Sequence, residues 1–389
     1  MASKLSNKQK IRSFLMISFG GASLFTGMSI FQGNEKFYDQ VVMRLIKSID
    51  PEIAHKMAVT AAKWEIIPKQ KTPDPVTLKQ NVWGLEFNNP LGMAAGFDKQ
   101  AEAVRGLIKS GFGFVEIGSV TPIPQVGNPK PRVFRLSEDK AVINRYGFNS
   151  DGHEIVRSRI AMLKQDPNFH GIVGVNLGKN KTSTDPVNDY VEGLKKFNDI
   201  ADYLVINVSS PNTEGLRDLQ AKKHLEVLLT EVNTVRNSIN SKVPLLLKLA
   251  PDLTQTEKKD IVDVIQKKKC KVDGLILSNT TIKRENLKDP YKNEKGGLSG
   301  APLTDLSTSF IADMFKLTEG KIPIIGVGGI FSGQDAFDKI NAGASLIQIY
   351  TSYTYHGPPV VQKIKRELND LLESNGYSSV ADAVGKGNN

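Results

Sequence analysis

Six groups of polar residues follow short apolar runs of the sequence, and their side chains suit hydrogen bonding and charge pairing at a common site. Amide groups both donate and accept hydrogen bonds, hydroxyl groups do the same, and lysine adds positive charge. Loop capping explains one such residue, whereas six groups at equivalent positions point to one shared site. The groups are Phe97-Asp98-Lys99, Gly118-Ser119, Asn176-Leu177-Gly178-Lys179, Asn207-Val208-Ser209-Ser210-Pro211-Asn212, Lys248 and Ser278-Asn279-Thr280.

A cluster of glycines, Gly326-Val327-Gly328-Gly329, suits a different chemistry. It leads through Phe331-Ser332-Gly333 into a helix expected to begin near Gln334. Glycines there let backbone N–H groups approach an anion at the helix start. Tyr350-Thr351-Ser352 ends the last apolar run and adds donors, and a flexible loop is expected over residues 296–300. The pattern predicts a phosphate-type anion site.

Missing motifs exclude several other kinds of site. Gly326-x-Gly328 is followed by Phe331 instead of a third glycine, no P-loop or HExxH motif occurs, and the five histidines do not pair at metal-ligand spacing. Ser210 is outside any GxSxG motif, which argues against a serine hydrolase. Cys270 is the only cysteine, so no internal disulfide or cysteine-built metal cluster can form. We expect no metal, and redox chemistry would need a bound organic cofactor or a partner.

Eight short apolar runs alternate with longer helical patterns from residue 81 onward. Nearly continuous apolar strands separated by helices indicate parallel pairing, because the helices cover the faces of such a sheet. The pattern predicts an α/β fold, a (β/α)8 TIM barrel whose polar groups meet at the carboxyl ends of the strands. A doubly wound open sheet is the alternative. Two alternating stretches, Pro131–Leu136 and Ala141–Tyr146, are expected to form an excursion over one barrel face. The runs are Leu91–Gly96, Val115–Val120, Ile172–Leu177, Tyr203–Val208, Leu245–Ala250, Gly274–Asn279, Ile322–Gly328 and Ser345–Thr351.

The 389 residues carry 51 basic and 41 acidic side chains, a formal charge of +10. The basic residues are scattered, so we expect no nucleic-acid partner. No acidic residue precedes Glu35, which is typical of a mitochondrial targeting segment, here residues 1–10. Residues 11–31 are mostly apolar over about 30 Å of helix, enough to cross a membrane. A single retained transmembrane helix is predicted, and a cleavable secretory signal is the alternative.

Residues 35–68 predict an amphipathic helical hairpin. Apolar residues recur at helical spacing from Phe37 to Ile49, and Asp50 with Pro51 predicts the N-cap and first turn of a second helix. The hairpin either packs on the main domain or lies at the membrane surface as an entrance for an apolar ligand. We assign residues 76–377 to the barrel and 378–389 to a tail.

The strand-end motifs resemble those of dihydroorotate dehydrogenases over about residues 50–377. Serine at position 210, where the soluble class carries cysteine, and the N-terminal extension resemble the membrane-bound, quinone-linked class 2. The resemblance implies FMN-dependent oxidation of (S)-dihydroorotate to orotate with ubiquinone as acceptor, EC 1.3.5.2, in de novo pyrimidine (UMP) biosynthesis. The motifs are Ala94–Lys99, Glu116–Thr121, Ile143–Asn149, Asn207–Asn212, Lys248–Asp252, Ser278–Thr281, Gly296–Gly300 and Gly326–Gly329.

The resemblance also implies roles for individual residues. Ser210 is the implied catalytic base, although nothing beside it in the sequence would activate its hydroxyl, and the hydride passes to FMN. Many amides and one lysine suit a planar anion. The implied substrate residues are Lys99, Asn144, Arg145, Tyr146, Gly147, Phe148, Asn207, Asn212, Asn279 and Thr280. The implied FMN residues are Ala95, Gly96, Lys99, Ser119, Asn176, Asn207, Lys248, Ser278, Gly300, Gly329, Tyr350 and Thr351.

A quinone tunnel formed by the hairpin is implied in the same way. Some family members carry glutamine about where Ile46 stands and an aromatic residue near Ala61, so a wider or less polar tunnel is expected here. The implied protein is a monomer in the mitochondrial inner membrane with its barrel on the intermembrane-space side. The early positive charges agree, since they keep the N-terminus in the matrix. The implied tunnel residues are Leu45, Ile46, His55, Ala58, Arg135 and Tyr350, with Ala61 and Ala62 as further apolar lining.

Three other interpretations stay open. Another FMN barrel could oxidise a different dihydropyrimidine or a hydroxy acid, although a hydroxy-acid oxidase needs a histidine base and none stands at a strand end. A non-catalytic membrane scaffold would purify colourless. A nucleic-acid-binding protein would be retained on a polyanion in a salt-dependent way.

Overall fold

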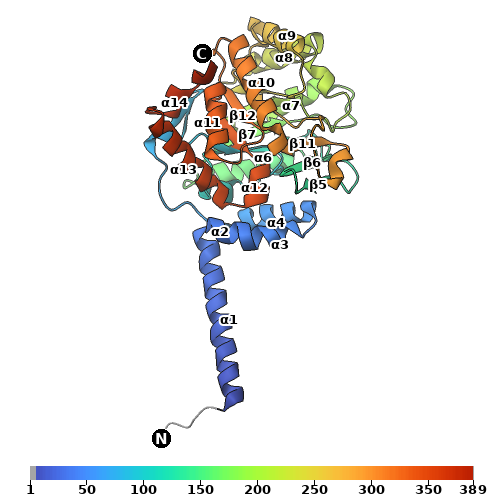
Figure 1. Cartoon of the computed structure of the whole chain (residues 1–389). Coiled ribbons are helices and arrows are strands. Elements are labelled where there is room, and N and C mark those ends of the chain that lie inside the picture. Colours follow the sequence, from blue (N-terminus) through green and yellow to red (C-terminus); the bar gives the residue numbers. More distant parts are fainter. Residues whose placement is uncertain (1–5, 389) are drawn as a thin grey trace.

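A computed structural model describes residues 6–388, and a closed barrel of eight parallel strands lies at their centre (Figure 1). Each predicted apolar run coincides with one barrel strand to within a few residues. The last strand closes the barrel by pairing with the first, which excludes the open-sheet alternative and confirms the TIM barrel. The strands are β3 (Leu91–Met93), β4 (Phe114–Val120), β7 (Ile172–Leu177), β8 (Tyr203–Asn207), β9 (Leu245–Leu249), β10 (Gly274–Leu277), β12 (Ile324–Val327) and β13 (Leu346–Ile349).

Amphipathic helices surround the barrel and bury one face each against the strands. In α13, for example, Val361, Ile364, Leu368 and Leu372 recur every three or four residues and are fully buried. The helices are α5 (Val104–Lys109), α6 (His153–Lys164), α7 (Pro186–Phe197), α8 (Lys222–Ser238), α9 (Gln255–Ile265), α10 (Thr304–Leu317), α11 (Gly333–Ala342) and α13 (Pro359–Ser374), followed by α14 (Val380–Ala383). The short helix α12 (Thr351–His356) begins directly after β13.

A two-stranded hairpin, β1 (Gln80–Val82) and β2 (Leu85–Phe87), packs at the amino end of the barrel. The ring of Phe87 packs edge-to-face on Phe114 inside the barrel, with centroids 5.3 Å apart. This hairpin was not among the predicted elements. Its turn residues, Trp83 and Gly84, both have positive φ, but the pair lacks the Asn-Gly or Asp-Gly signal that usually marks such a turn.

A three-stranded antiparallel sheet covers the carboxyl ends of the barrel strands, called the barrel mouth below. The predicted excursion supplies β5 (Val133–Leu136) and β6 (Ala141–Asn144), as expected. The third strand, β11 (Gly297–Gly300), pairs with β6, so the prediction of a flexible loop over residues 296–300 is wrong. Its glycines permit close approach, since a Cβ atom on Gly297 would lie 2.0 Å from Thr280 Oγ1.

The N-terminal helix α1 (Asn7–Gln32) projects away from the barrel (Figure 1). Among the described residues it is the one helix long and apolar enough to cross a membrane, by length and composition. It extends beyond the predicted span of 11–31 at both ends and includes part of the predicted targeting segment, of which residues 1–5 lie outside the described chain. The structure thus contains one candidate membrane span.

The predicted hairpin lies between α1 and the barrel mouth (Figure 1). Its second helix starts as expected, because Asp50 accepts hydrogen bonds from the N–H groups of Glu52 and Ile53, both at 3.0 Å, and Pro51 occupies the first turn. The hairpin elements are α2 (Glu35–Phe37), a π-helical turn (Tyr38–Val42), α3 (Met43–Lys47) and α4 (Pro51–Lys63).

Candidate active site

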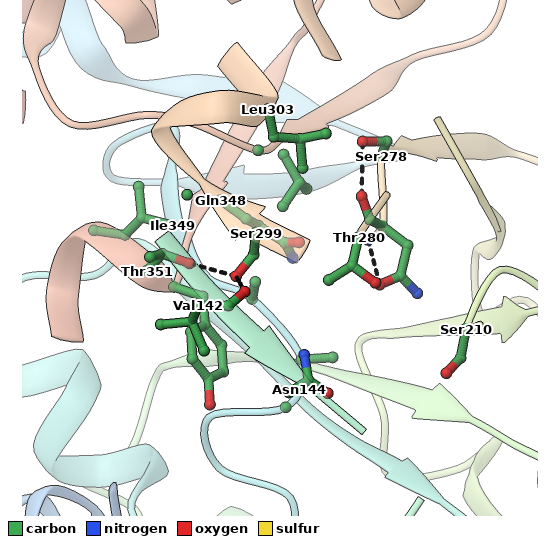
Figure 2. Close-up of a pocket in the computed structure, with 18 of the residues that line it drawn as sticks. Val142, Asn144, Ser210, Ser278, Thr280, Ser299, Leu303, Gln348, Ile349 and Thr351 are labelled. Carbon is green, nitrogen blue, oxygen red and sulfur yellow. Dashed lines mark hydrogen bonds between the residues drawn. The ribbon is translucent and has the colours of Figure 1, made fainter. Parts of the chain in front are cut away.

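The barrel mouth contains a cavity of about 160 Å³, the mouth cavity, and most of the predicted site residues line it (Figure 2). They come from the ends of the barrel strands and from the covering sheet. Parallel strands bring these distant segments to one place, as the barrel prediction required. The lining includes Ser210, the substrate candidates Lys99, Asn144, Tyr146, Gly147, Phe148, Asn207, Asn212, Asn279 and Thr280, and the cofactor candidates Ala95, Gly96, Ser119, Lys248, Ser278, Gly300, Gly329, Tyr350 and Thr351.

Two predicted residues do not line the mouth cavity. The Arg145 guanidinium donates to Glu294 Oε2 at 2.6 Å and stacks on the ring of Phe134, so it is held away from the cavity by an acidic and an aromatic partner. Asn176 is fully buried behind the wall, where its Oδ1 accepts a hydrogen bond from Asn207 Nδ2 at 3.0 Å. The structure thus does not bring these two side chains to the lining of the mouth cavity, and their predicted ligand contacts stay predictions.

The amide groups of the mouth are fixed by one another. Asn207 Nδ2 donates to Ser119 Oγ at 2.9 Å, and Asn207 Oδ1 accepts from Ser209 Oγ at 2.8 Å. Asn279 Nδ2 donates to Ser209 Oγ at 2.9 Å, and Asn212 Nδ2 donates to Asn144 Oδ1 at 3.3 Å. Such a network orients each donor and acceptor before a ligand arrives.

A buried glutamate, Glu116, lies below the amides and was missed in the sequence. Its carboxylate accepts hydrogen bonds from Lys248 Nζ at 3.2 Å, Asn176 Nδ2 at 2.8 Å and Gln348 Nε2 at 2.7 Å, and Tyr203 OH lies 3.4 Å away. A buried carboxylate needs such partners, because an isolated one is very costly. The signal was available: Glu116 is an acidic residue within a mostly apolar run that predicted a barrel strand.

Ser210 stands on the loop after β8, where its Oγ accepts a hydrogen bond from the Asn212 N–H at 3.3 Å. Within residues 6–388, neither a carboxylate nor an imidazole hydrogen-bonds to this hydroxyl. Arg217 fixes the loop by donating to Ser209 O at 2.9 Å and to Thr280 O at 2.8 Å. The loop is therefore well positioned, while activation of the serine by a neighbouring base is not evident.

Lys99 places an ammonium group against an aromatic ring at the cavity edge. Its Nζ lies 3.9 Å from the ring centroid of Tyr146. Burial, followed by the charge of Arg132, lowers the pKa of Lys99 to about 7. An anionic ligand would reverse this effect, because it stabilises the charged amine.

The glycine cluster faces the mouth cavity, but not through the helix start that we expected. Gly328, Gly329 and Ile330 line the cavity, and their N–H groups have no acceptor among the described residues. At the start of α11, by contrast, Asp335 Oδ2 accepts from the Ser332 N–H at 2.9 Å and Glu367 Oε2 accepts from the Gly333 N–H at 2.7 Å. The prediction of an anion site at this helix start is wrong, since the protein's own carboxylates occupy it.

A second cavity of about 280 Å³, the hairpin cavity, lies between the hairpin and the barrel. Its lining is mostly apolar. Of the predicted tunnel residues, Leu45 lies outside it, with 68% of its surface exposed. Ala62 also lies outside, because it packs so closely on α5 that a Cβ atom on Gly106 would lie 1.9 Å from Ala62 O. The predicted residues that do line it are Ile46, His55, Ala58, Ala61, Arg135 and Tyr350.

The polar groups of the hairpin cavity are tied to backbone carbonyls. His55 Nε2 lies 2.7 Å from Phe97 O and must donate to it, so its Nδ1 accepts from Tyr146 OH at 3.1 Å. Burial, and then the charge of Lys99, lowers the pKa of His55 to about 3, which keeps the ring neutral. Arg135 donates to Lys47 O at 2.7 Å, at the carboxyl end of α3.

A thin wall separates the two cavities. Val133, Val142, Tyr146 and Tyr350 line both of them. The polar mouth cavity and the apolar hairpin cavity are thus separated by a wall of four side chains.

Comparison with known proteins identifies the family to which this arrangement belongs. The dihydroorotate dehydrogenase family model matches residues 77–372. The chain belongs to the dihydroorotate dehydrogenase family. It is 52% identical over 374 residues to the mitochondrial dihydroorotate dehydrogenase (quinone) of Mus musculus, covering 94% of each chain. It is 50% identical over 373 residues to the corresponding protein of Oryza sativa, covering 89% of this chain and 79% of the relative.

Solved structures of the family agree with the fold. The ligand-free enzyme of Eimeria tenella superposes with a TM-score of 0.84 at 45% identity, covering 87% of this chain and 99% of that one. The chain is an oxidoreductase of the dihydroorotate dehydrogenase (quinone) class, EC 1.3.5.2, a family of flavoenzymes in pyrimidine biosynthesis. Mitochondrial relatives and one apolar N-terminal helix are consistent with the mitochondrial inner membrane.

Proposed function

We propose that the protein oxidises (S)-dihydroorotate to orotate with FMN bound in the mouth cavity, and that ubiquinone reoxidises the flavin from the hairpin cavity. The observation that carries this proposal is the shared wall of Tyr146, Tyr350, Val133 and Val142. A polar substrate can occupy the mouth cavity and an apolar acceptor the hairpin cavity, and a flavin in the mouth cavity at the shared wall can exchange electrons with both.

The donors around the mouth cavity fit FMN. Within residues 6–388, the backbone N–H groups of residues 328–330 have no acceptor and the buried hydroxyl of Ser352 has no partner, so hydrogen-bonding capacity is free for a phosphate. Lys248 supplies a positive charge for an electron-rich ring. FMN bound here would supply two-electron redox chemistry, with capacity to accept a hydride from the substrate and to release electrons to a quinone.

The substrate is held by the amide network and by Lys99. The amides of Asn144, Asn207, Asn212 and Asn279 can pair with the carbonyl and N–H edges of a pyrimidine ring. Lys99 balances the carboxylate, and the approach of that anion raises the pKa of its ammonium group above 7.

Ser210 takes the proton from C5 of the substrate. Its oxygen has a free lone pair, since the Asn212 N–H is its one partner among the described residues. A serine hydroxyl is a weak base, so its own proton must move on to solvent or to a neighbouring acceptor as it receives the new one. The fixed loop supplies orientation, which is the larger part of what a positioned base contributes.

We further propose that the barrel stands on the intermembrane-space side of the membrane, that the protein acts as a monomer, and that it has no nucleic-acid partner. The orientation is supported by the positive charges of Lys8, Lys10 and Arg12 at the start of α1, which favour retention of that end in the matrix. The quinone reaches the hairpin cavity from the membrane side, where α1 joins the hairpin.

The test is an anaerobic titration of the purified holoenzyme with dihydroorotate, following the visible absorption of the flavin. We expect stoichiometric bleaching, and then recovery of colour on addition of a ubiquinone analogue. A yellow protein that does not bleach would contradict the substrate and favour another dihydropyrimidine. A protein that stays colourless after incubation with FMN would contradict the cofactor.

A further inference from the structure

Lys339, on α11, is fully buried and has no acidic partner within 4 Å among the described residues. Its Nζ donates to Ser307 Oγ at 2.7 Å, to Thr308 Oγ1 at 2.8 Å and to Thr304 O at 3.3 Å. These three acceptors lie on α10, which runs beside α11 (Figure 1). All of them are neutral, which is unusual for a buried lysine.

The hydrogen bonds of Lys339 suit its charged form. The hydroxyl of Ser307 lies 2.8 Å from Gly328 O and 3.1 Å from Thr304 O, and the hydroxyl of Thr308 donates to Thr304 O at 2.8 Å. With both hydroxyl protons directed to carbonyls, the lysine donates in all three of its contacts, which matches the three N–H groups of an ammonium. Burial lowers the pKa of Lys339 to about 7, against the opposing charges of Asp335, Asp338 and Asp305.

The same helix α10 orients the glycine cluster of the mouth cavity. Ser307 binds the carbonyl of Gly328, and Thr304 Oγ1 donates to the carbonyl of Gly329 at 2.8 Å. In a trans peptide the N–H points opposite to the C=O. Anchoring both carbonyls on α10 therefore directs the N–H groups of Gly329 and Ile330 toward the cavity that they line.

Glycine is needed for this close packing. Gly328 and Gly329 have φ of +119° and +71°, and a Cβ atom on Gly329 would lie 2.2 Å from Thr304 Oγ1. The ammonium of Lys339 thus lies one hydroxyl group away from the peptide whose other side faces the cavity.

We propose that Lys339 selects a phosphorylated flavin over riboflavin, acting as a positioning residue whose ammonium group, paired with no carboxylate of the described residues, lies behind the N–H groups at residues 328–330. This inference rests on the proposed flavin site in the mouth cavity. A phosphate dianion there adds to the opposing charges of Asp335, Asp338 and Asp305, none of which forms an ion pair with Lys339. The attraction is stronger than in bulk water because Lys339 is fully buried. The ammonium also polarises Ser307 and the peptide beyond it, which strengthens the hydrogen bonds to the anion.

The experiment compares the affinities of FMN and riboflavin for the full-length protein and its Lys339→Met variant. The detergent-solubilised holoenzyme is stripped of flavin and titrated with FMN or with riboflavin. Flavin fluorescence, which differs between the bound and the free flavin, measures the dissociation constant. We expect the dissociation constant of FMN to rise roughly ten- to a hundredfold, while that of riboflavin changes less than about twofold. Lys365→Met is the matched control, since Lys365 is equally buried but pairs with Asp74 at 2.6 Å, away from the cavity. It should leave the ratio of the two affinities unchanged.

A second variant, Ser307→Ala, keeps the charge and removes the hydroxyl that links it to Gly328. We expect a smaller loss of FMN preference, and this variant decides the question if Lys339→Met does not fold. An unchanged ratio of FMN to riboflavin affinity in the folded variants would overturn the role of Lys339 and leave the flavin site intact. Failure of the unaltered protein to bind either flavin would contradict the proposed cofactor, and the inference with it.

Discussion

The mouth cavity and the hairpin cavity share a wall but differ in the polarity of their linings. In the mouth, amides, hydroxyls and buried charges hold one another in place, as Asn207 does with Ser119 and Ser209. In the hairpin cavity the side chains are mostly apolar, and His55 and Arg135 bind backbone carbonyls. The mouth cavity therefore selects ligands by the arrangement of their hydrogen-bonding groups, and the hairpin cavity selects ligands by their shape and apolar surface area. One protein can thus be strict toward a polar substrate and tolerant toward an apolar one.

The two regions are also attached differently. The mouth is formed by the ends of barrel strands, which the whole core supports. The hairpin packs against the outside of this core, with Ala62 of α4 in close contact with α5 and with Glu52 paired to Arg132, whose Nη2 lies 2.9 Å from Glu52 Oε1. Changes in the mouth should therefore affect the reaction with dihydroorotate, and changes in the hairpin the reaction with quinone.

The largest expected effect comes from removing the proposed base. Ser210→Ala should slow flavin reduction by dihydroorotate about 10²–10⁴-fold, because this change removes the oxygen proposed to accept the proton. Stopped-flow bleaching under anaerobic conditions measures this rate. Flavin content and reoxidation by quinone serve as controls and should stay normal. A variant that bleaches at the normal rate would show that another residue takes the proton.

The next effect concerns the buried charges of the mouth. Glu116→Gln leaves the ammonium of Lys248 without its counter-charge and should reduce stability by about 3–5 kcal/mol. Chemical denaturation of the detergent-solubilised protein measures this loss. Glu138→Gln, at an exposed glutamate, is the matched control and should be nearly neutral. Equal stability of the two variants would argue against a charge-paired mouth.

A smaller effect should follow from filling the hairpin cavity. Ala58→Trp places a large side chain in the cavity and should raise the KM for quinone roughly tenfold or more, with dihydroorotate bleaching unchanged. Leu45→Trp adds a similar ring at an exposed position and should leave quinone kinetics unaltered. If both variants behaved alike, the cavity would not be the quinone site.

The smallest effect concerns pH. The pKa of His55 is about 3 in the folded protein and near 6.5 when unfolded, so the unfolded chain binds an extra proton between these values. Stability from this group is complete above pH 6.5 and falls as the pH decreases, by about 1 kcal/mol between pH 6.5 and 5.5. His55→Phe should show a smaller decrease, with part remaining because burial also lowers the pKa of His153 to about 4, whereas His170→Phe, at an exposed histidine, should retain the full decrease. Denaturation midpoints at the two pH values provide the measurement.

Local sequence was sufficient to predict the barrel and most of the mouth. The carboxyl ends of parallel barrel strands meet at the mouth, so Lys99, Ser210 and Lys248 could be placed there from strand order. Asn176, also at a strand end, nevertheless lies behind the cavity wall. The N-cap of α4 was likewise a local signal.

Contacts between distant elements could not be predicted in this way. Arg145 turns away from the cavity because Glu294, far along the chain, binds it. The start of α11 binds no external anion because Glu367 on α13 reaches it. Nothing in the sequence around Lys339 indicates that its side chain is buried, and its neutral hydrogen-bond partners come from another helix, α10. Each of these three contacts joins side chains on elements that are far apart in the sequence, and only the folded structure shows which of them are neighbours.

The closure of the barrel has a consequence for how the protein is made. Its last strand, β13, pairs with its first, with Ile347 beside Leu91, and the residues after both strands complete the mouth. The candidate membrane helix α1 lies at the start of the chain and β13 near its end, so α1 is synthesised long before the barrel can close. The capacity to hold the proposed flavin, and with it the yellow colour, is therefore acquired only when nearly the whole sequence is available. A chain truncated before β13 would keep α1 and should be colourless.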